Sequence, residues 1–347
     1  MKAVQISEYG SPEVLTVVDL PVPTPGPGQI LVKVEAAGVN FSDVTRRRND
    51  PYPDATPLPF VLGGEVAGTV TARGEGVDEP ALGSVVFGLA GVGGEGGYAE
   101  YALMSAAGAI LVPPTVQVNE AAALIVTGLS ALVLLREAAR LEAGDVLFVP
   151  AASGGFGSYA VQFGKLLGAT VIGAASTQEK RQAAMENGAD FVIDSRSTGW
   201  ADEVRRLTDG RGADVVLEMT SPAHLTQSIR ALAPFGRLIT YGAVAGRGSE
   251  VSGAALEPLL YDPAPGQMIA GFNLGQWFAH RYPVVIQALQ DLVSWAGAGS
   301  ITVPPVQEFD LADAAAAHRL LESGASTGKL VLRPRHRHDG SGTLGAQ

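Results

Sequence analysis

The chain has 347 residues, of which 46% are hydrophobic, 17% are charged and none is cysteine, so disulfides, thiolate metal sites and cysteine nucleophiles are excluded. Its 35 acidic and 24 basic residues give a formal net charge of −11, which argues against nucleic acid as a partner. The start of the chain is too charged for a signal peptide, and no uninterrupted apolar run reaches about 18 residues. We therefore expect a cytoplasmic protein that does not enter a membrane.

The length suggests two domains, and residues 1 to about 120 have the pattern of a strand-rich one. Short β-branched runs are bounded there by turn residues, as in a sandwich or barrel. They lie at residues 30–34, 68–71 and 84–87. Residues 21–28 hold four prolines, which lack ladder donors, so this segment is predicted to be a loop.

From residue 118 to 140 the apolar spacing becomes helical, with an interruption at Thr127 and Gly128. From 144 on, apolar strands alternate with helical stretches, which predicts parallel βαβ units. The predicted strands are residues 146–149, 170–173, 191–193, 215–217 and 237–241, with helices at 158–167, 178–187 and 225–232. The last part is predicted as a helix at 284–295, a strand at 304–309, a helix at 312–322 and a strand at 329–332.

A glycine-rich turn follows the predicted strand at 146–149 and opens the next helix. A pyrophosphate needs backbone N–H groups that no Cβ shields and the positive end of a helix dipole. Gly154 and Gly155 permit that approach, and Gly157 lets the helix pack closely on the sheet. Ala152 stands where the dinucleotide fingerprint has its first glycine. We predict a dinucleotide cofactor at this turn.

The following strand indicates which dinucleotide is bound. It ends near Ser176 without the carboxylate that would read the ribose of NAD, and Glu179, Lys180 and Arg181 come only later. Ser176 and Lys180 are suited to a 2′-phosphate, which a carboxylate would repel. NADPH is therefore favoured over NADH, although Lys180 and Arg181 also fit a solvated helix face.

Several ordered motifs, spanning residues 1 to about 332, resemble a known superfamily. They are Gly38-Val39-Asn40-Phe41-Ser42-Asp43-Val44, Leu62-Gly63-Gly64-Glu65-Val66-Ala67-Gly68, the glycine turn at 151–157, and the ending from His318 through Gly328-Lys329-Leu330-Val331-Leu332. The chain resembles the zinc-independent medium-chain dehydrogenase/reductases, specifically the quinone oxidoreductase (zeta-crystallin-like) group. It is similar also to the enoyl reductases of polyketide synthesis.

The resemblance implies an α/β fold with a GroES-like β-rich catalytic domain plus a Rossmann doubly wound parallel sheet. We assign residues 1–120 to the catalytic domain, with 264–335 returning to it, and 121–263 to the NADPH-binding domain. Residues 336–347 are predicted to be a disordered tail. The resemblance also implies a homodimer. Residues 243–270 fit either a mobile cover or part of an interface.

The zinc-dependent relatives place a cysteine ligand where this chain has Asn40 and a histidine where it has Gly64, so the usual zinc sites cannot be assembled. Without a Lewis acid, a conjugated acceptor suits the site better than an isolated ketone, because its developing enolate needs only hydrogen bonds. We hypothesise NADPH-dependent reduction of a quinone or an α,β-unsaturated carbonyl acceptor. The alternatives are a stand-alone enoyl-thioester reductase of polyketide or fatty-acid type and a cofactor-binding relative without activity.

Two residues are predicted to be catalytic. Asn40 should face the nicotinamide or the substrate oxygen, and thus also contact the cofactor. Tyr52 fits a hydrogen bond to a substrate carbonyl or a proton donor, although a tyrosine between prolines is also a common packing residue. The other predicted cofactor contacts are Thr127, Ser153, Gly154, Gly155, Phe156, Gly157, Ser176, Lys180, Ser195, Tyr241, Gly242, Phe272, Asn273, Leu274 and Lys329.

Part of this set depends on the resemblance alone. Lys329 resembles the C-terminal lysine that reaches the cofactor phosphates in relatives, and an exposed lysine is its alternative. Ser195 occupies the place where some relatives have a tyrosine near the adenosine. The isolated residues His224, His280 and His318 have no second metal ligand nearby in sequence, and we predict structural roles for them.

Overall fold

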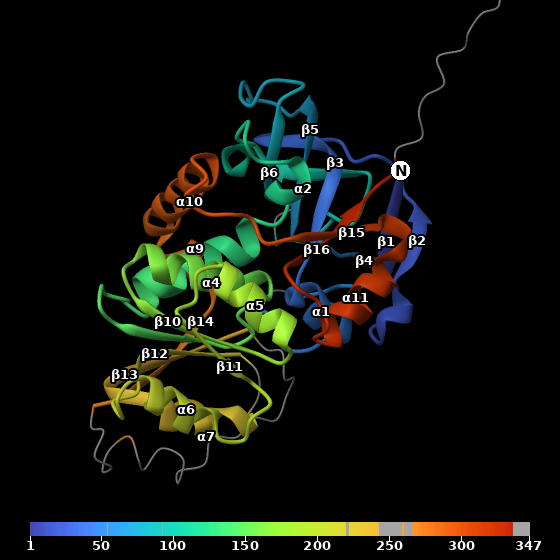
Figure 1. Cartoon of the computed structure of the whole chain (residues 1–347). Coiled ribbons are helices and arrows are strands. Elements are labelled where there is room, and N and C mark those ends of the chain that lie inside the picture. The colour runs from blue at the N-terminus through green and yellow to red at the C-terminus, as the bar shows by residue number, and fades with distance from the viewer. Residues whose placement is uncertain (54, 92, 220–221, 243–258, 260–265, 336–347) are drawn as a thin grey trace, which may run out of the picture.

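The computed structural model describes residues 1–335 except 54, 92, 220–221, 243–258 and 260–265. The predicted tail at 336–347 and most of the segment at 243–270 lie outside the described residues. The described elements form a β-rich part that is antiparallel except for one parallel pair, β15 with β16, and a parallel sheet with helices on both faces (Figure 1). The expected α/β architecture is confirmed.

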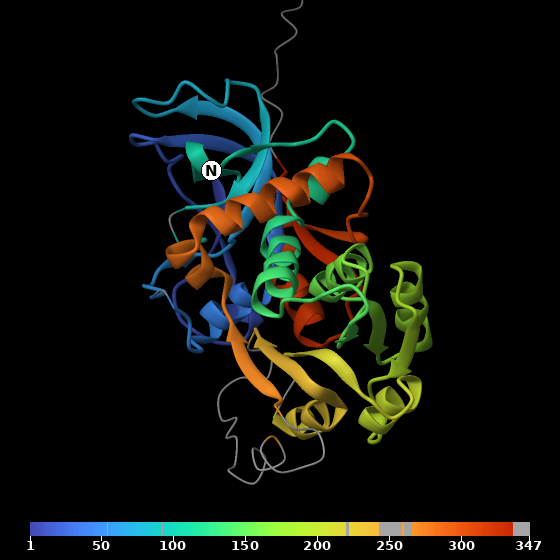
Figure 2. The same cartoon turned by 90° about the vertical axis from the view of Figure 1, so that its left-hand side faces the viewer.

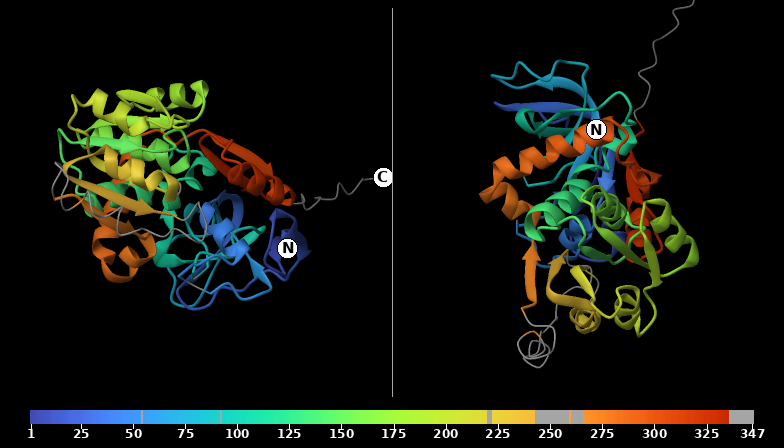
Figure 3. Two further views of the ribbon diagram at one scale, coloured as in Figure 1. Left: turned by 90° about the horizontal axis from the view of Figure 1, so that it is seen from below. Right: turned by 60° about the vertical axis from the view of Figure 1, so that its left-hand side comes forward.

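The antiparallel part consists of a three-stranded sheet in the order β2-β1-β4 and a seven-stranded sheet in the order β15-β16-β3-β5-β6-β8, with β7 on β3. The strands are β1 (Lys2–Ile6), β2 (Thr16–Asp19), β3 (Gln29–Val39), β4 (Phe60–Val61), β5 (Glu65–Arg73), β6 (Val85–Leu89), β7 (Tyr101–Ser105), β8 (Ile110–Leu111), β15 (Val306–Asp310) and β16 (Lys329–Arg333). The first domain therefore takes its last two strands from the C-terminal part of the chain, which lie beside the N-terminal strands (Figure 3).

The parallel sheet has the strand order β11-β10-β9-β12-β13-β14. Its strands are β9 (Val146–Val149), β10 (Thr170–Ala175), β11 (Phe191–Asp194), β12 (Ala213–Glu218), β13 (Leu232–Tyr241) and β14 (Met268–Phe272). Helices α4 (Gly155–Leu166) and α5 (Gln178–Glu186) cover one face, and α6 (Trp200–Leu207) and α7 (Pro222–Ala231) cover the other (Figure 1). The order reverses next to β9, which is where such sheets open a crevice at the carboxyl ends of their strands.

One boundary differs from our assignment. We placed residues from 264 on with the first domain, but β14 pairs with β13 in parallel register, Met268 opposite Arg237. Four of the five residues of β14 are exposed, so this strand lacks the buried apolar run from which its neighbours in the sheet were predicted. The chain returns to the antiparallel part only with β15.

The remaining helices either belong to the antiparallel part or lie between the two parts. They are η1 (Pro12–Val14), α1 (Phe41–Arg48), η2 (Ala106–Gly108), α2 (Val118–Ala121), η3 (Ile125–Leu129), α3 (Ser130–Val133), η4 (Leu134–Ala138), α9 (Leu274–His280), α10 (Tyr282–Gly297), η5 (Leu311–Asp313) and α11 (Ala314–Glu322). The predicted interruption at Thr127 is a π-helical turn, η3. Helix α10 crosses over η3 and α3 between the two parts (Figure 2). No helix of the described residues has the length and apolar character to cross a bilayer.

Candidate functional site

A cavity of about 1070 Å³ is lined by residues from both the antiparallel part and the parallel sheet. All the residues that we predicted as catalytic or cofactor-binding line it. They are Asn40, Tyr52, Thr127, Ser153, Gly154, Gly155, Phe156, Gly157, Ser176, Lys180, Ser195, Tyr241, Gly242, Phe272, Asn273, Leu274 and Lys329. The fold thus brings the whole predicted set to one place, while the role of each residue toward a ligand remains a prediction.

The glycine turn joins β9 to α4 at one wall of the cavity. A Cβ on Gly157 would lie 2.2 Å from the carbonyl oxygen of Ala151, so no larger residue fits there without moving the backbone. Helix α4 begins directly after Gly154, and the backbone N–H groups of its first turn lack intrahelical partners. The turn therefore forms a cradle for an anion at the positive end of a 12-residue helix.

Ala152, in the place of the first fingerprint glycine, is fully buried. A Cβ on Gly173 in β10 would lie 3.0 Å from the Ala152 Cβ, so the glycine in the neighbouring strand makes the room that this alanine needs. The departure from the fingerprint is thus accommodated inside the sheet, away from the cavity.

In the first turn of α5, the helix that follows β10, Lys180 and Arg181 take different directions. The Arg181 guanidinium lies 3.3 Å from the Asp194 carboxylate and does not line the cavity. The Lys180 amine does line it and donates to the Gly324 carbonyl at 2.6 Å, and partial burial lowers its pKa. Of the two cations, Lys180 is the one placed to meet a ligand. Glu218 and His224 also line this region, and sequence reasoning missed both as cavity residues.

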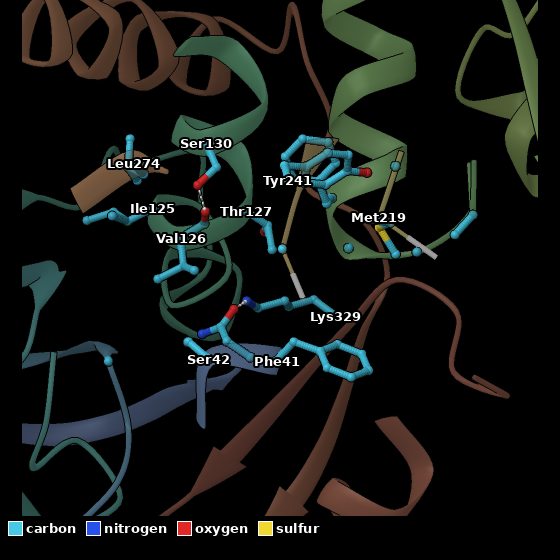
Figure 4. Close-up of a pocket in the computed structure, with 18 of the residues that line it drawn as sticks. Phe41, Ser42, Ile125, Val126, Thr127, Ser130, Met219, Tyr241, Leu274 and Lys329 are labelled. Carbon is cyan, nitrogen blue, oxygen red and sulfur yellow. Dashed lines mark hydrogen bonds between the residues drawn. The ribbon is translucent and has the colours of Figure 1, made fainter. Parts of the chain in front are cut away.

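Phe156 and Tyr241 form an aromatic wall opposite Thr127. Their ring centroids lie 4.1 Å apart at an interplanar angle of 27°. The Tyr241 hydroxyl is buried and has no hydrogen-bond partner among the described residues, and burial raises its pKa well above the usual value. Figure 4 shows Tyr241 on the side of Thr127 that faces Met219, away from Ile125 and Leu274.

Asn40, Glu65 and Lys329 form a buried polar cluster, and two of its members, Asn40 and Lys329, line the cavity; Figure 4 labels Lys329. The Lys329 amine donates to the Asn40 side-chain oxygen and, at 2.6 Å, to Glu65 Oε1. Asn40 Nδ2 donates to the same Glu65 oxygen at 3.0 Å, and the backbone N–H of Val126 donates to Glu65 Oε2 at 2.8 Å. An ammonium group has three donors, so Lys329 keeps one N–H beyond these two bonds.

Three adjacent strands build this cluster. Gly38 in β3 lies opposite Glu65 in β5 and opposite Val331 in β16. A Cβ on Gly38 would lie 2.3 Å from Glu65 Oε1, so the glycine leaves the space that the carboxylate occupies. Asn40 follows at the end of β3 and caps α1. The motif around Asn40 thus does two things. It ends strand β3, and its Gly38 leaves room for the Glu65 carboxylate.

We expected Lys329 at the cofactor phosphates. Its amine instead meets Asn40 and Glu65, while its stem passes beside Gly155, where a Cβ would lie 3.4 Å from Lys329 Cδ. The lysine therefore lies at the junction between the glycine turn and the rest of the cavity. Tyr52 lines the cavity on the side of α1, with the Arg46 guanidinium 5.0 Å from its ring centroid.

A second buried network supports the cap of α1. Arg47 donates to His318 Nδ1 at 3.0 Å, so His318 Nε2 carries the hydrogen and donates to the Tyr98 oxygen at 3.1 Å. Tyr98 in turn donates to Asp43 Oδ2 at 3.1 Å, and the same oxygen accepts the backbone N–H of Asn40 at 2.9 Å. This Arg47–His318–Tyr98–Asp43 chain was not predicted, although we expected His318 to be structural.

Burial shifts the titration of two members of this chain. It raises the pKa of Asp43 to about 6, against the hydrogen bonds from Asn40, Tyr98 and Gly63. Burial, together with the Arg47 charge, lowers the pKa of His318 to about 3, so the imidazole stays neutral. Among the described residues no three histidine, aspartate or glutamate side chains gather in a way that would hold a metal ion.

Comparison with known proteins gives two family matches. Residues 26–114 match the alcohol dehydrogenase GroES-like domain, and residues 155–291 match a family described as zinc-binding dehydrogenase. The chain is 34% identical over 336 residues to a quinone oxidoreductase of Pseudomonas aeruginosa, a match that covers 96% of this chain and 99% of that protein.

The chain is also 34% identical over 334 residues to a subunit of the phenolphthiocerol/phthiocerol polyketide synthase of Mycobacterium tuberculosis, but it spans only 15% of that protein's length. Among solved structures, the Escherichia coli quinone oxidoreductase complexed with NADPH matches with a TM-score of 0.87 at 29% identity, over 96% of this chain and 100% of that one. The quinone oxidoreductase of Pseudomonas syringae matches with a TM-score of 0.86 at 32% identity, over 96% and 99%.

Proposed function

This chain is an oxidoreductase of the quinone oxidoreductase group of the medium-chain dehydrogenase/reductases, and from that membership we propose that it reduces quinones or α,β-unsaturated carbonyl compounds with NADPH and without zinc. The observation that carries the proposal is the Asn40–Glu65–Lys329 cluster. It places a cation, rather than a set of metal ligands, beside the glycine turn.

The cavity fits NADPH on its own geometry. The cradle at Gly154 and Gly155 suits the pyrophosphate, because residues without a Cβ let the backbone approach it, while Gly157 lets the start of α4 pack closely on the turn. Ser176 directly after β10 and Lys180 in the first turn of α5 suit the 2′-phosphate. Bound there, NADPH supplies a hydride, which together with one proton from water reduces the acceptor by two electrons.

The polar cluster is suited to the acceptor oxygen. We assign the remaining N–H of Lys329 to this oxygen, where negative charge develops during reduction. Glu65 and Asn40 hold the amine in position, and Glu65 offsets its charge, so Lys329 acts as a fixed hydrogen-bond donor. A conjugated acceptor needs no more than such a donor, whereas an isolated ketone gains most from a Lewis acid.

Consumption of NADPH across a panel of acceptors tests this proposal. The panel holds a benzoquinone, a short enone and the matching saturated ketone, each assayed with and without a metal chelator. We expect turnover of the quinone and the enone, little of the ketone, and no effect of the chelator. Preference for the saturated ketone, or loss of activity on chelation, contradicts the proposal.

The polyketide synthase match favours one second candidate, an enoyl-thioester reductase. Turnover of a crotonyl thioester against a free enone of the same chain length distinguishes the two. A relative without activity would bind NADPH tightly and turn over no member of either panel.

We also propose a homodimer through the outer edge of β14. This strand pairs with β13 on one side, and within the described residues no strand pairs with its other side. Met268 is 54% exposed and Ile269 is 36% exposed, so an apolar edge is left open, and such edges invite pairing with a second chain. Sedimentation equilibrium of the protein and of an Ile269→Lys variant checks this, since the variant should be monomeric.

A further inference from the structure

Helix α10 carries two apolar stripes on different faces. Val285, Ala288, Leu292 and Ala296 are buried in the main core. Tyr282, Ile286 and Leu289 follow the i, i+4, i+7 spacing of a second stripe and line the cavity. Tyr282 is 51% exposed, and Ile286 and Leu289 are only half-buried. The described part of the protein thus leaves this second stripe partly uncovered.

Other apolar side chains complete a wall around the same space. We call the part of the cavity that they enclose the acceptor arm. It is lined by Leu89, Ile110, Ile125, Leu274, Phe278, Tyr282, Ile286 and Leu289. Figure 4 shows two residues of the acceptor arm, Ile125 and Leu274, on the opposite side of Thr127 from Tyr241 and Met219.

The charged side chains that line the cavity lie outside the acceptor arm. Among the described lining residues they are Lys180 on α5, Glu218 on β12, Glu322 on α11 and Lys329 on β16. None belongs to the elements that form the acceptor arm, and the charge of Lys329 is balanced by Glu65 at 2.6 Å. A carboxylate or phosphate in this arm would lose its water without gaining a cation, which costs far more than burying an alkyl group.

Building on the reductase proposed above, we infer that its acceptor is an uncharged carbonyl compound with an apolar tail. The carbonyl end lies at Lys329, and the tail runs along the Tyr282–Ile286–Leu289 stripe of α10. This assigns a tail-binding subsite to the acceptor arm and excludes acceptors that carry an acid group along the tail.

Straight-chain enones that differ only in tail length test the inference. We expect kcat/KM to rise about threefold per added methylene until the arm is filled, because each buried methylene gains a fixed increment of transfer free energy. The same enones ending in a carboxylate should be at least about a hundredfold poorer. A flat dependence on tail length, or equal use of the carboxylate series, overturns the inference.

A matched pair of variants locates the subsite. Ile286→Ala should lower kcat/KM for the longest enone about fivefold and leave the shortest enone unchanged. Val284→Ala on the same helix is the control, because Val284 is also half-buried but does not line the cavity. Equal effects of the two variants, or an Ile286→Ala effect that does not depend on tail length, contradict the assignment.

Binding of saturated methyl ketones separates this inference from the reductase proposal. Their Kd for the NADPH-loaded protein, followed by nicotinamide fluorescence, should fall with tail length whether or not any acceptor is reduced. Length-dependent binding without turnover would refute the reductase and keep the subsite. Turnover of a short enone or quinone without any length dependence in rate or binding would refute the subsite and keep the reductase.

Discussion

The amine of Lys329 lies 2.6 Å from a carboxylate oxygen of Glu65, although 264 positions separate the two residues in the chain. They meet because β16 and β5 flank β3 in one sheet. Both side chains are almost completely buried, at 3% and 1% exposure. Each charge of such a pair depends on the other, because removal of one partner leaves the remaining charge buried and unpaired.

Lys329→Met should therefore destabilise the protein strongly. It leaves the Glu65 charge buried without a partner, and we expect the free energy of unfolding to fall by about 3–5 kcal/mol in urea denaturation. The double variant Glu65→Gln/Lys329→Met removes both charges and should recover most of that loss. Additive losses in the double variant would mean that the two charges do not depend on each other.

The same double variant tests the role of Lys329 in the reaction, with Glu65→Gln alone as the control. If Lys329 donates to the acceptor oxygen, kcat should fall about a hundredfold while the Kd for NADPH changes less than about threefold. A Kd that weakens as much as the activity would instead make Lys329 a ligand of the cofactor phosphates, the role expected from the sequence.

Lys180→Ala should weaken the preference for NADPH over NADH. A charge-assisted hydrogen bond to a phosphate is worth about 1.5–3 kcal/mol, so the KM for NADPH should rise about tenfold to a hundredfold while the KM for NADH stays the same. Lys165→Ala is the matched control, because the Lys165 amine pairs with Asp190 at 2.7 Å away from the cavity. Equal changes for both cofactors would show that Lys180 does not read the 2′-phosphate.

The Arg47–His318–Tyr98–Asp43 chain predicts a distinctive pH dependence of stability. The pKa of His318 is lowered from 6.5 to about 3, so its contribution is complete above pH 6.5 and is lost as the pH falls. The pKa of Asp43 is raised from 3.8 to about 6, so its contribution is complete below pH 3.8 and is lost as the pH rises through 6. Between pH 4 and 6 the two slopes oppose each other.

Two variants separate these slopes. In Asp43→Asn only the contribution of His318 remains. The free energy of unfolding should then fall by about 1.4 kcal/mol for each pH unit as the pH is lowered from 6 to 4. His318→Gln leaves the Asp43 term, and stability should rise on the same acidification. Urea denaturation at three pH values measures both, and slopes identical to the unsubstituted protein would refute the assignment of either pKa.

The sequence predicted the parts of the site whose residues are neighbours in the chain. The glycine turn was predictable because strand, glycines and helix are contiguous, and the interruption at Thr127 was visible in the apolar spacing. The Lys329–Glu65 pair was not, because only the sheet order brings the two residues together. Glu65 stood in the motif at residues 62–68, but its position there gave no sign of a partner. The structure shows where the two strands meet, because Gly38 pairs with Glu65 on one side and with Val331 on the other.

The hydrogen-bonded network from Arg47 to Asp43 could not be predicted from the sequence either. His318 lies 271 positions from Arg47 and 220 from Tyr98. Sequence spacing says nothing about such distant hydrogen bonds. The edge strand β14 was assigned to the wrong part of the fold for a related reason. Its exposed side chains do not form the buried apolar run of the other parallel strands, and only the backbone pairing with β13 shows where it belongs.

The backbone N–H of Gly328 donates to the Ser153 carbonyl at 2.9 Å, and Gly154 and Gly328 form an isolated parallel bridge. The two domains are thus joined by main-chain bonding at the point where the phosphate cradle and Lys329 lie. A rotation of one domain against the other that keeps this bond would turn about it. Rotation would then barely change the distance from the cradle to Lys329, whereas it would widen or narrow the distant end between α10 and the antiparallel strands. The acceptor would then enter and leave without any change in how tightly the cofactor is bound.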